Sequence, residues 1–235
     1  METEQQVFEA LRLATQILAG EGVLDGFGHV SARNPRQVDR YFMVRDNSSA
    51  SQAAGDFVEL DRESHPVLED GPRPSMERFI HGEIYRVRPD VQAIVHTHAP
   101  ELLAFGVSAT PLRPVSHMCG FLAQGALVFD IAKECGETNM LVTTPASGQA
   151  LARCLGKSAV VLMRGHGATV VGASLKEAVF RAIYATVNAR MQPVAMALGN
   201  PKYLSLQEAA LADDLHKSVL DRPWQFLANK WSAFT

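Results

Sequence analysis

A chain of 235 residues is long enough for one sizeable domain with a full hydrophobic core. Apolar residues make up 47% of it and charged residues 20%, which is the balance of an ordinary globular protein. The formal net charge of −3 gathers neither nucleic acid nor an anionic membrane, and no apolar run approaches the roughly 20 residues that span a bilayer. We therefore expect no nucleic acid and no membrane among its partners.

The first residues and the cysteines bear on the cellular compartment. The start METEQQVFEALRLATQ is acidic and then helical in pattern, unlike a secretory signal or an Arg-rich transit peptide. Cys119, Cys135 and Cys154 are odd in number and form no C-x-x-C pair, which argues against a disulfide framework. We expect a cytoplasmic protein. We interpret Cys119 as a small buried hydrophobic residue, because no nucleophile signature surrounds it.

The first third of the chain predicts a helix, three strands and a second helix. Residues 5–19 form the first helix, because apolar residues recur at helical spacing and two glycines follow. Its apolar face consists of Val7, Leu11, Ala14, Ile17 and Leu18. The glycine-rich GFGHVSARNP leads into a strand, and YFMVR and FVELD are further strands, separated by the polar loop DNSSASQAAGD. SMERFIHGEIYRV is the second helix, with Ser75 as N-cap and a stripe of Ile80, Ile84 and Val87.

The remainder predicts four more strands and two or more helices. The strands are VQAIVHTHA, ALVFD, NMLVTT and SAVVLMRGHGATVVG. A long helix begins at SLKEAVFRAIYATVNARM with Ser174 and Glu177 in capping-box spacing, and we expect Pro193 to kink or end it. The segment from about residue 200 is again helical in pattern. Because no linker marks a boundary, we expect residues 1–235 to form one layered α/β domain with a C-terminal helical tail.

Two histidines stand at alternate positions where the strand VQAIVHTHA ends. Side chains two apart on a strand point the same way, so His96 and His98 present their imidazoles to one side, about 7 Å apart along the backbone. That arrangement suits two ligands of one metal ion, since imidazole is a common donor to divalent transition metals. Alone, the H-x-H pattern is weak, because histidine pairs also cap strands or join polar networks.

Two further residues strengthen the metal hypothesis. His166 lies between glycines in RGHG directly after an apolar strand, where the backbone can approach closely and the ring is unobstructed; a tight turn that carries a histidine is the alternative. Glu77 lies at the start of the helix that runs into the H-x-H strand, where it could instead provide only a favourable helix-terminal charge. Three histidines and one carboxylate suit Zn²⁺, Mn²⁺, Fe²⁺ or Co²⁺, and the ligand types do not choose among them.

On these residues the sequence resembles the class II aldolase/adducin family. The matching motifs are PSMERFIH with Glu77, VHTHAP with His96 and His98, RGHG with His166, and the early glycine turn GFGHVSAR. The resemblance covers roughly residues 5–200. It implies a single three-layer α/β/α domain with a central mixed, mostly antiparallel sheet, and one divalent metal ion per subunit held by these four side chains. Family members commonly form four-fold symmetric tetramers with the site near a subunit boundary, so we expect a homotetramer.

The sequence departs from the sugar-phosphate aldolases of this family at the phosphate site. Those enzymes hold the phosphate with a Gly-Asn turn, a Thr-Gly loop and two serines before the glutamate. The corresponding positions read GH at residues 28–29, RDN at residues 45–47 and SM at residues 75–76. A phosphate needs several backbone or hydroxyl donors, and most of them are replaced here. The departures therefore argue against a sugar phosphate.

A small acidic substrate remains compatible with the side chains that stand at or near these positions. We expect the substrate-binding residues to be His29, Arg45, Ser75 and Arg164. On a continuing strand Arg164, two residues before His166, faces the same pocket and offers its guanidinium to a carboxylate. The alternative is a surface arginine at a strand end.

Two more histidines are candidates for supporting roles. Where the aldolases have a tyrosine as general acid, the segment PVSHMCGF holds His117, which can move a proton in either direction near neutral pH. The alternative is a satisfied histidine beside the core. His81 follows Glu77 by one helical turn, so we expect it to orient that carboxylate.

The resemblance points most closely to family members that decarboxylate hydroxylated pyridine-dicarboxylates and dihydroxyphthalates. We therefore predict a divalent-metal-dependent decarboxylase of a hydroxylated aromatic or conjugated carboxylic acid, acting through an enolate that the metal stabilises. Glu77 or His117 would protonate the carbon. The alternatives are an aldolase that cleaves a hydroxy-keto acid or sugar phosphate, and an Fe²⁺ oxygenase on the same scaffold. A non-catalytic adducin-like module is disfavoured because it has no need of four intact ligands.

Overall fold

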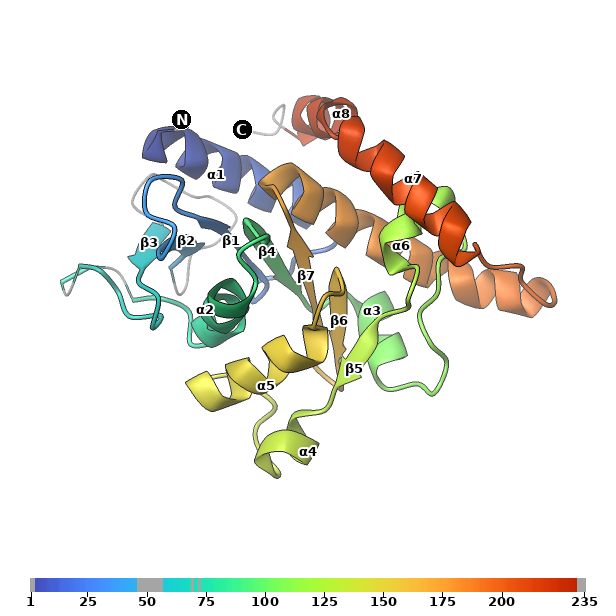
Figure 1. Ribbon diagram of the computed structural model, residues 1–235, viewed down its shortest axis with the longest axis horizontal. Helices are drawn as coiled ribbons and strands as arrows, with labels where there is room; N and C mark the ends of the chain where they lie inside the picture. The colour runs from blue at the N-terminus through green and yellow to red at the C-terminus, as the bar shows by residue number, and fades with distance from the viewer. Residues whose placement is uncertain (1–2, 46–56, 69, 72, 232–235) are drawn as a thin grey trace.

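A seven-stranded sheet forms the centre of the computed structural model, which describes residues 3–45, 57–68, 70–71 and 73–231 (Figure 1). The strands are β1 (His29–Arg33), β2 (Tyr41–Val44), β3 (Phe57–Leu60), β4 (Ala93–Thr97), β5 (Leu127–Phe129), β6 (Val160–Met163) and β7 (Gly167–Gly172). Their spatial order is β3-β2-β1-β4-β7-β6-β5, and every neighbouring pair is antiparallel except the parallel pair of β5 and β6. The predicted mixed, mostly antiparallel sheet is confirmed.

Helices cover both faces of this sheet. On one face lie α1 (Glu4–Gly20), α3 (Pro100–Gly106), α6 (Leu175–Leu198) and α8 (Asp221–Trp231). On the other lie α2 (Arg78–Val87) and α5 (Pro145–Leu155), with the short α4 (Ile131–Cys135) beside α5. The 3₁₀ helix η2 (His117–Leu122) packs between α6 and α7 (Leu206–Ser218). No helix of the described residues combines the length and apolar character needed to cross a membrane.

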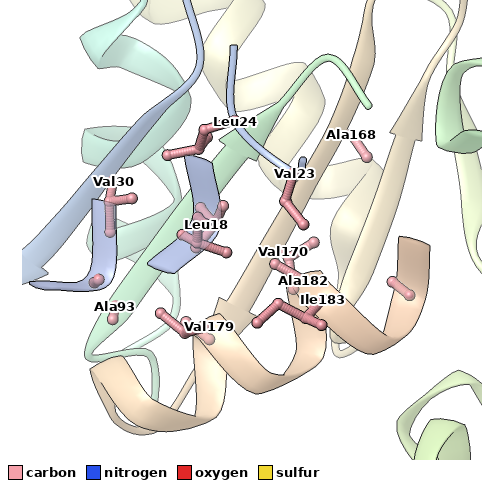
Figure 2. Close-up of a cluster of buried hydrophobic side chains, with 14 of the residues drawn as sticks. Leu18, Val23, Leu24, Val30, Ala93, Ala168, Val170, Val179, Ala182 and Ile183 are labelled. Atoms are coloured by element: carbon pink, nitrogen blue, oxygen red, sulfur yellow. The ribbon is translucent and has the colours of Figure 1, made fainter. Parts of the chain in front are cut away.

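The larger core lies between the sheet and the helices α1 and α6. Figure 2 shows Leu18, Val30, Val170, Val179 and Ile183 meeting there from α1, β1, β7 and α6. The predicted apolar face of α1 is buried at all five of its positions, which confirms that helix. Burial of both faces of the central strands explains why β4 is apolar throughout before its histidines begin.

The strand β4 sets which face of the sheet receives its histidines. Ala93 and Val95 belong to the core under α1 and α6, whereas Ile94 belongs to the core under α2 and α5. His96 has the same parity as Ile94, so it points to the side of α2 and α5. The histidines thus face the helix whose start carries Glu77.

The predicted strand NMLVTT is wrong, because residues 139–144 form a loop that runs into the N-cap of α5. The side chains of Thr138 and Asn139 accept hydrogen bonds from the backbone N–H groups of Met140 and Leu141. Met140 adopts a left-handed conformation with φ of 72°. Such local bonds compete with a strand ladder, which explains why an apolar segment does not join the sheet.

The predicted continuous strand SAVVLMRGHGATVVG is also wrong, because it is two strands. β6 and β7 pair as an antiparallel hairpin, with residues 164–166 in the turn between them. Gly165 has φ of 66°, a conformation that glycine adopts without steric cost, and it reverses the chain there. The expectation that Arg164 and His166 share one face of a strand therefore fails.

The ends of two helices differ from the prediction. α2 begins at Arg78 with Glu77 as its N-cap and no side-chain capping bond, so the predicted N-cap role of Ser75 is wrong. Ser75 Oγ instead accepts the N–H of Glu77 at 3.2 Å. In the predicted stripe Ile80 and Ile84 are buried, but Val87 is half exposed at the end of the helix.

The long helix α6 is capped as predicted, since the side chain of Ser174 accepts the N–H of Glu177. Pro193 does not end it. The helix continues to Leu198 and stops at Gly199, where φ is 146°. The C-terminal tail is helical as predicted, and Trp231 of α8 packs on the end of α1, with its indole N–H donating to Glu21 at 2.9 Å.

Candidate metal centre

Four side chains from different segments converge at one end of β4. They are Glu77 at the N-cap of α2, His96 in β4, His98 just beyond it, and His166 in the turn between β6 and β7. Each offers one ligand atom, and these atoms all lie within 4.8 Å of one another. The structure thus brings together all four residues that the sequence singled out as metal ligands.

Strand pairing places the turn with His166 beside the histidines of β4. β7 pairs with β4, so that Ala168 lies opposite Thr97. Gly167 makes this close approach possible, because a Cβ atom at that position would collide with the carbonyl oxygen of Thr97. The glycine after His166 therefore seats the ring against β4.

The Nδ1 atoms of the three histidines are directed away from the centre. His166 Nδ1 lies 3.0 Å from the carbonyl oxygen of Met140, and because a carbonyl only accepts, the ring donates from Nδ1. His98 Nδ1 lies 3.1 Å from a carboxylate oxygen of Asp25, and His96 Nδ1 lies 3.5 Å from Thr169 Oγ1. Such outer partners fix the tautomer and leave the lone pair of Nε2 for a metal.

The lone pairs of the Nε2 atoms are not satisfied by a hydrogen-bond donor among the described residues. His96 Nε2 and His98 Nε2 lie 3.1 Å apart, and His166 Nε2 is buried without a hydrogen-bond partner among the described residues. A shared cation would satisfy buried nitrogens that converge in this way. The donor set of three imidazoles and one carboxylate fits a divalent transition-metal ion.

Glu77 is held as an ionised carboxylate. Its Oε1 accepts the backbone N–H of Val142 at 2.9 Å, and its Oε2 lies 3.5 Å from His166 Nε2 and 3.7 Å from His96 Nε2. Burial alone would raise the pKa of Glu77. Proximity to His166 and His96 and the Val142 N–H outweigh burial and lower the pKa to about 2.

The loop of residues 139–144 thus supports two of the candidate ligands. The Met140 carbonyl orients His166, and the Val142 N–H orients Glu77. The sequence does not predict this role, because the apolar composition of the segment is typical of a strand. The adjacent Thr138 and Asn139 are the sequence signal for a turn at this position, because such side chains readily bond to nearby backbone groups.

A pocket of about 320 Å³ opens beside the centre. Glu77 and His98 line it, together with three of the four predicted substrate-binding residues: His29, Arg45 and Ser75. Its apolar lining comes from Phe27, Val44, Met76 and Leu141. Two of the predicted positions, Asp46 and Asn47 of the RDN segment, lie outside the described residues.

His29 reaches this pocket from the first residue of β1, opposite His96 of β4. The two rings lie 5.0 Å apart between centroids. His29 Nδ1 lies 2.8 Å from His81 Nε2. The expectation that His81 orients Glu77 is wrong, because His81 bonds to His29 and Ser31. α2 begins only after Glu77, so the two residues do not share a helix face.

Burial and neighbouring charges keep the inner histidines neutral. Burial, followed by proximity to His81, lowers the pKa of His29 well below its ordinary value. Burial, followed by the charge of His29, does the same for the pKa of His96 against the opposing effect of Glu77. Neutral imidazole is the form that binds metals, so the shift at His96 favours metal binding. At His166 the neighbouring Glu77 outweighs burial and raises the pKa, so this ring must give up any second proton when a metal binds.

Two predicted residues are not brought to the pocket within the chain. Arg164 lies in the turn between β6 and β7, where its Nε is 2.7 Å from the carboxylate of Asp130. His117 is exposed at the start of η2, and its ring lies 5.1 Å from that of His216 in α7. Neither lines the pocket beside the metal centre.

Fold and site define an α/β protein with a candidate divalent-metal centre beside a small-molecule pocket. Residues 9–193 match the model of the family described as Class II Aldolase and Adducin N-terminal domain. The match covers most of the chain, so the chain belongs to the class II aldolase/adducin family. It is an enzyme of the lyase class.

Named relatives support this placement. The chain is 41% identical over 220 residues to decarboxylase tropJ from Talaromyces stipitatus, an alignment that covers 88% of this chain and 80% of the relative. It is 31% identical over 209 residues to a 3,4-dihydroxyphthalate decarboxylase from a Terrabacter species, covering 86% and 87% of the two chains. The crystal structure of an aldolase II superfamily protein from Pseudomonas syringae aligns with a TM-score of 0.80 at 20% identity, covering 99% of this chain and 94% of that one. The fold is therefore shared with that protein.

Proposed function

We propose that the chain is a divalent-metal-dependent decarboxylase of a hydroxylated aromatic or similarly conjugated carboxylic acid. One observation carries the proposal: the pocket beside the candidate metal centre combines an apolar lining with donors suited to an acid. Its volume of about 320 Å³ lies at the small end of ligand pockets, as a single-ring substrate requires. The relatives whose names include decarboxylase act on ring acids of this kind where their names state a substrate.

The apolar lining favours a flat ring over a sugar. Phe27 is 81% exposed yet lines the pocket, so its ring is available for contact with a ligand. Met76 and Leu141 add further apolar surface. An aromatic substrate would bury these side chains, whereas a sugar phosphate would leave most of its hydroxyl groups facing apolar atoms.

The polar lining suits a carboxylate. Arg45 offers a guanidinium, Ser75 a hydroxyl and His29 a ring nitrogen. A planar carboxylate pairs well with a guanidinium fork and one further donor. A phosphate would need more donors, and the serine that would supply one of them is replaced by Met76.

The candidate metal ligands and the pocket residues have separate roles in the proposed reaction. A metal ion held by Glu77, His96, His98 and His166 would supply a Lewis acid that draws electron density from the substrate. The ring carbon that bears the carboxylate first takes up a proton, which converts the hydroxylated ring to its keto form. The bond between this carbon and the carboxylate then breaks, CO₂ leaves, and the electron pair of that bond returns to the ring. Arg45 and Ser75 hold the acid in the orientation that this step requires.

We assign the proton transfer to Glu77 or His117. Glu77 lines the pocket, but its carboxylate is ionised, so it must first take up a proton, which the substrate hydroxyl can provide. It would then return that proton to the ring carbon. His117 lies outside the pocket of its own chain, and its role requires a neighbouring copy.

The experiment is a product assay on protein reconstituted in turn with Mn²⁺, Zn²⁺, Fe²⁺ and Co²⁺. Substrates are hydroxylated benzene and pyridine dicarboxylates, hydroxy-keto acids and sugar phosphates, with products followed by mass spectrometry. We expect metal-dependent CO₂ release from a ring acid. Release of an aldehyde, with every ring acid unchanged, would replace the decarboxylase with an aldolase. Oxygen consumption would point to an oxygenase.

A pair of histidine variants provides the matched control. His96→Ala removes a candidate ligand and should abolish metal binding and turnover together. His65→Ala changes a histidine whose side chain is 69% exposed and whose partner is Asp61, so it should retain both. A metal-free His96→Ala protein with full activity would end the metal mechanism.

We further propose a cytoplasmic homotetramer. α7 exposes Leu206, Leu211 and Leu215, each more than half exposed, and α8 exposes Phe226. Apolar side chains grouped in this way are typical of surfaces that contact another chain. Light scattering coupled to size exclusion gives the subunit number, and a mass of one chain would contradict this assembly.

A further inference from the structure

Four buried polar side chains form a hydrogen-bonded chain that leads from the interior to the substrate pocket. The hydroxyl of Tyr85 lies 2.8 Å from Ser31 Oγ, and Ser31 Oγ lies 2.6 Å from His81 Nδ1. His81 Nε2 lies 2.8 Å from His29 Nδ1. At the far end, His29 Nε2 is buried without a partner among the described residues, although His29 lines the pocket. The acceptor or donor that completes this ring must therefore come from the pocket.

Each bond needs one donor and one acceptor, so the directions of neighbouring bonds are coupled. If Ser31 accepted from both Tyr85 and His81, its own buried hydrogen would have no acceptor among the described residues. If Tyr85 donates to Ser31, the Ser31 hydroxyl donates to His81 Nδ1. His81 then carries its hydrogen on Nε2 and donates it to His29 Nδ1. Consequently His29 carries its own hydrogen on Nε2. In this direction every hydrogen of the hydrogen-bonded chain has an acceptor except the hydrogen on His29 Nε2, which would need an acceptor from a ligand in the pocket.

The reverse direction is disfavoured by the buried tyrosine. In that direction Ser31 donates to the Tyr85 oxygen, and the hydroxyl hydrogen of Tyr85 loses its acceptor, since Ser31 is the partner of this hydroxyl among the described residues. Tyr85 is 6% exposed, so loss of this bond would leave a buried hydroxyl hydrogen without an acceptor among the described residues. His81 remains neutral because burial lowers its pKa to about 3, so it cannot donate from both nitrogens.

We propose that the Tyr85–Ser31–His81 chain holds His29 in the Nε2–H tautomer and so makes it a fixed donor for a carboxylate oxygen of the substrate. His29 then selects an acceptor and rejects an amino or ammonium group at the same place. Tyr85, Ser31 and His81 act through His29 and are positioning residues. The nature of the ligand rests on the proposed function, whereas the tautomer does not.

The tautomer is measured by long-range ¹H–¹⁵N correlation spectra of zinc-loaded protein labelled with ¹⁵N-histidine. His29→Gln identifies the His29 signals by their loss. We expect His29 and His81 each to carry one hydrogen on Nε2. A hydrogen on Nδ1 of His29, or on both of its nitrogens, would overturn the proposal whatever the enzyme's activity.

Three serine variants separate the positioning role from ordinary destabilisation. Ser31→Ala removes the link that sets the direction, so the His29 signals should split between two tautomers. Ser31→Thr keeps the hydroxyl and should restore one tautomer. Ser64→Ala removes another buried serine hydroxyl, which accepts a hydrogen bond from Tyr41 at 3.0 Å and takes no part in the hydrogen bonds that lead to His29. This variant should leave the tautomer of His29 unchanged. A single unchanged tautomer in folded Ser31→Ala would contradict the proposal.

The donor role is measured by calorimetry with dihydroxybenzoate and the matching catechol, which lacks the carboxylate. His29→Ala should lower the affinity for the acid by about tenfold to a hundredfold, as loss of a hydrogen bond to a charged group predicts, and leave the catechol affinity nearly unchanged. An equal loss for both ligands would refute selection of the carboxylate. If neither ligand binds the wild-type protein, the proposed function fails, and the spectra still decide the tautomer.

Discussion

Met140 and His166 are joined by a hydrogen bond from His166 Nδ1 to the Met140 carbonyl oxygen, at 3.0 Å. Met140 presents that carbonyl from a left-handed conformation, which most residues avoid. Two residues later, Val142 donates its N–H to Glu77. Two candidate ligands are thus oriented by the backbone of one short loop. Residues that bind no metal themselves therefore determine whether the centre is assembled.

Asp25 plays the equivalent part for His98. Its Oδ1 accepts the N–H groups of Phe27 and Gly28 at 2.9 and 2.8 Å and lies 3.1 Å from His98 Nδ1. We expect Asp25→Ala to weaken metal binding by about tenfold to a hundredfold, because the ring loses its orienting partner. A titration against a competing chelator measures this. Asp90→Ala, which removes an exposed partner of Arg88, is the control and should bind metal normally. Unchanged affinity in Asp25→Ala would contradict the orienting role.

The sequence predicts the candidate ligands because their spacing reflects local geometry. Side chains alternate in direction along an extended strand, so His96 and His98 lie on one side of β4 and its continuation. This placement does not depend on the rest of the fold. Flanking glycines mark the turn of His166, and Gly167 is in fact required where the turn meets β4. These features depend on a few neighbouring residues, so a pattern of residue types is sufficient to find them.

The contacts among the supporting residues could not be predicted, because these residues meet only through tertiary packing. His29 and His81 lie 52 positions apart in the sequence, and Ser31 and Tyr85 lie 54 apart. Their contacts depend on α2 lying over β1, which no local pattern specifies. The loop at Met140 misled the prediction for a different reason. Its apolar composition is typical of a strand, while two polar side chains divert its backbone bonds.

Phe27 tests the proposed aromatic substrate. Its side chain is 81% exposed and lines the pocket, so Phe27→Ala should leave the free energy of unfolding within about 0.5 kcal/mol of wild type. Loss of the ring contact should raise KM for an aromatic acid by about three- to tenfold, with a smaller effect on kcat. Val38→Ala, which also truncates an exposed apolar side chain but one that does not line this pocket, is the control. An unchanged KM in Phe27→Ala would argue against ring stacking at this position.

His117 tests whether a second chain completes the site. It is exposed on η2 and does not line the pocket of its own chain, so a catalytic role requires that it reach a neighbour. We expect His117→Ala to bind metal normally and to lose most of its kcat, by about a hundredfold or more. Full activity in this variant would show that the catalytic assignment is wrong.

Co-assembly distinguishes action within a chain from action between chains. His117→Ala and His96→Ala should each have little activity alone. Mixed oligomers contain pockets with His96 from one chain and His117 from another, so activity should return when the two are refolded together. If His117 lowers activity but mixing restores none, the residue acts in another way than across a subunit boundary.

Glu77 makes the stability of the metal-free protein depend on acid pH. Its pKa falls from an ordinary 4.5 to about 2 in the folded chain. Because the folded pKa lies below the unfolded one, the contribution is complete above about pH 5 and is lost as the pH falls towards 2. The shift corresponds to a contribution on the order of 3 kcal/mol to the free energy of unfolding.

Urea unfolding of chelator-treated protein between pH 3 and pH 7 measures this dependence. Wild type should lose stability steeply below pH 5. Glu77→Gln keeps the shape of the side chain but cannot ionise, so its stability should be lower at pH 7 and should fall less as the pH drops. Glu63→Gln changes an exposed glutamate away from the metal centre and should follow the wild-type curve. Parallel curves for wild type and Glu77→Gln would mean that the carboxylate is not held ionised by His96, His166 and the Val142 N–H.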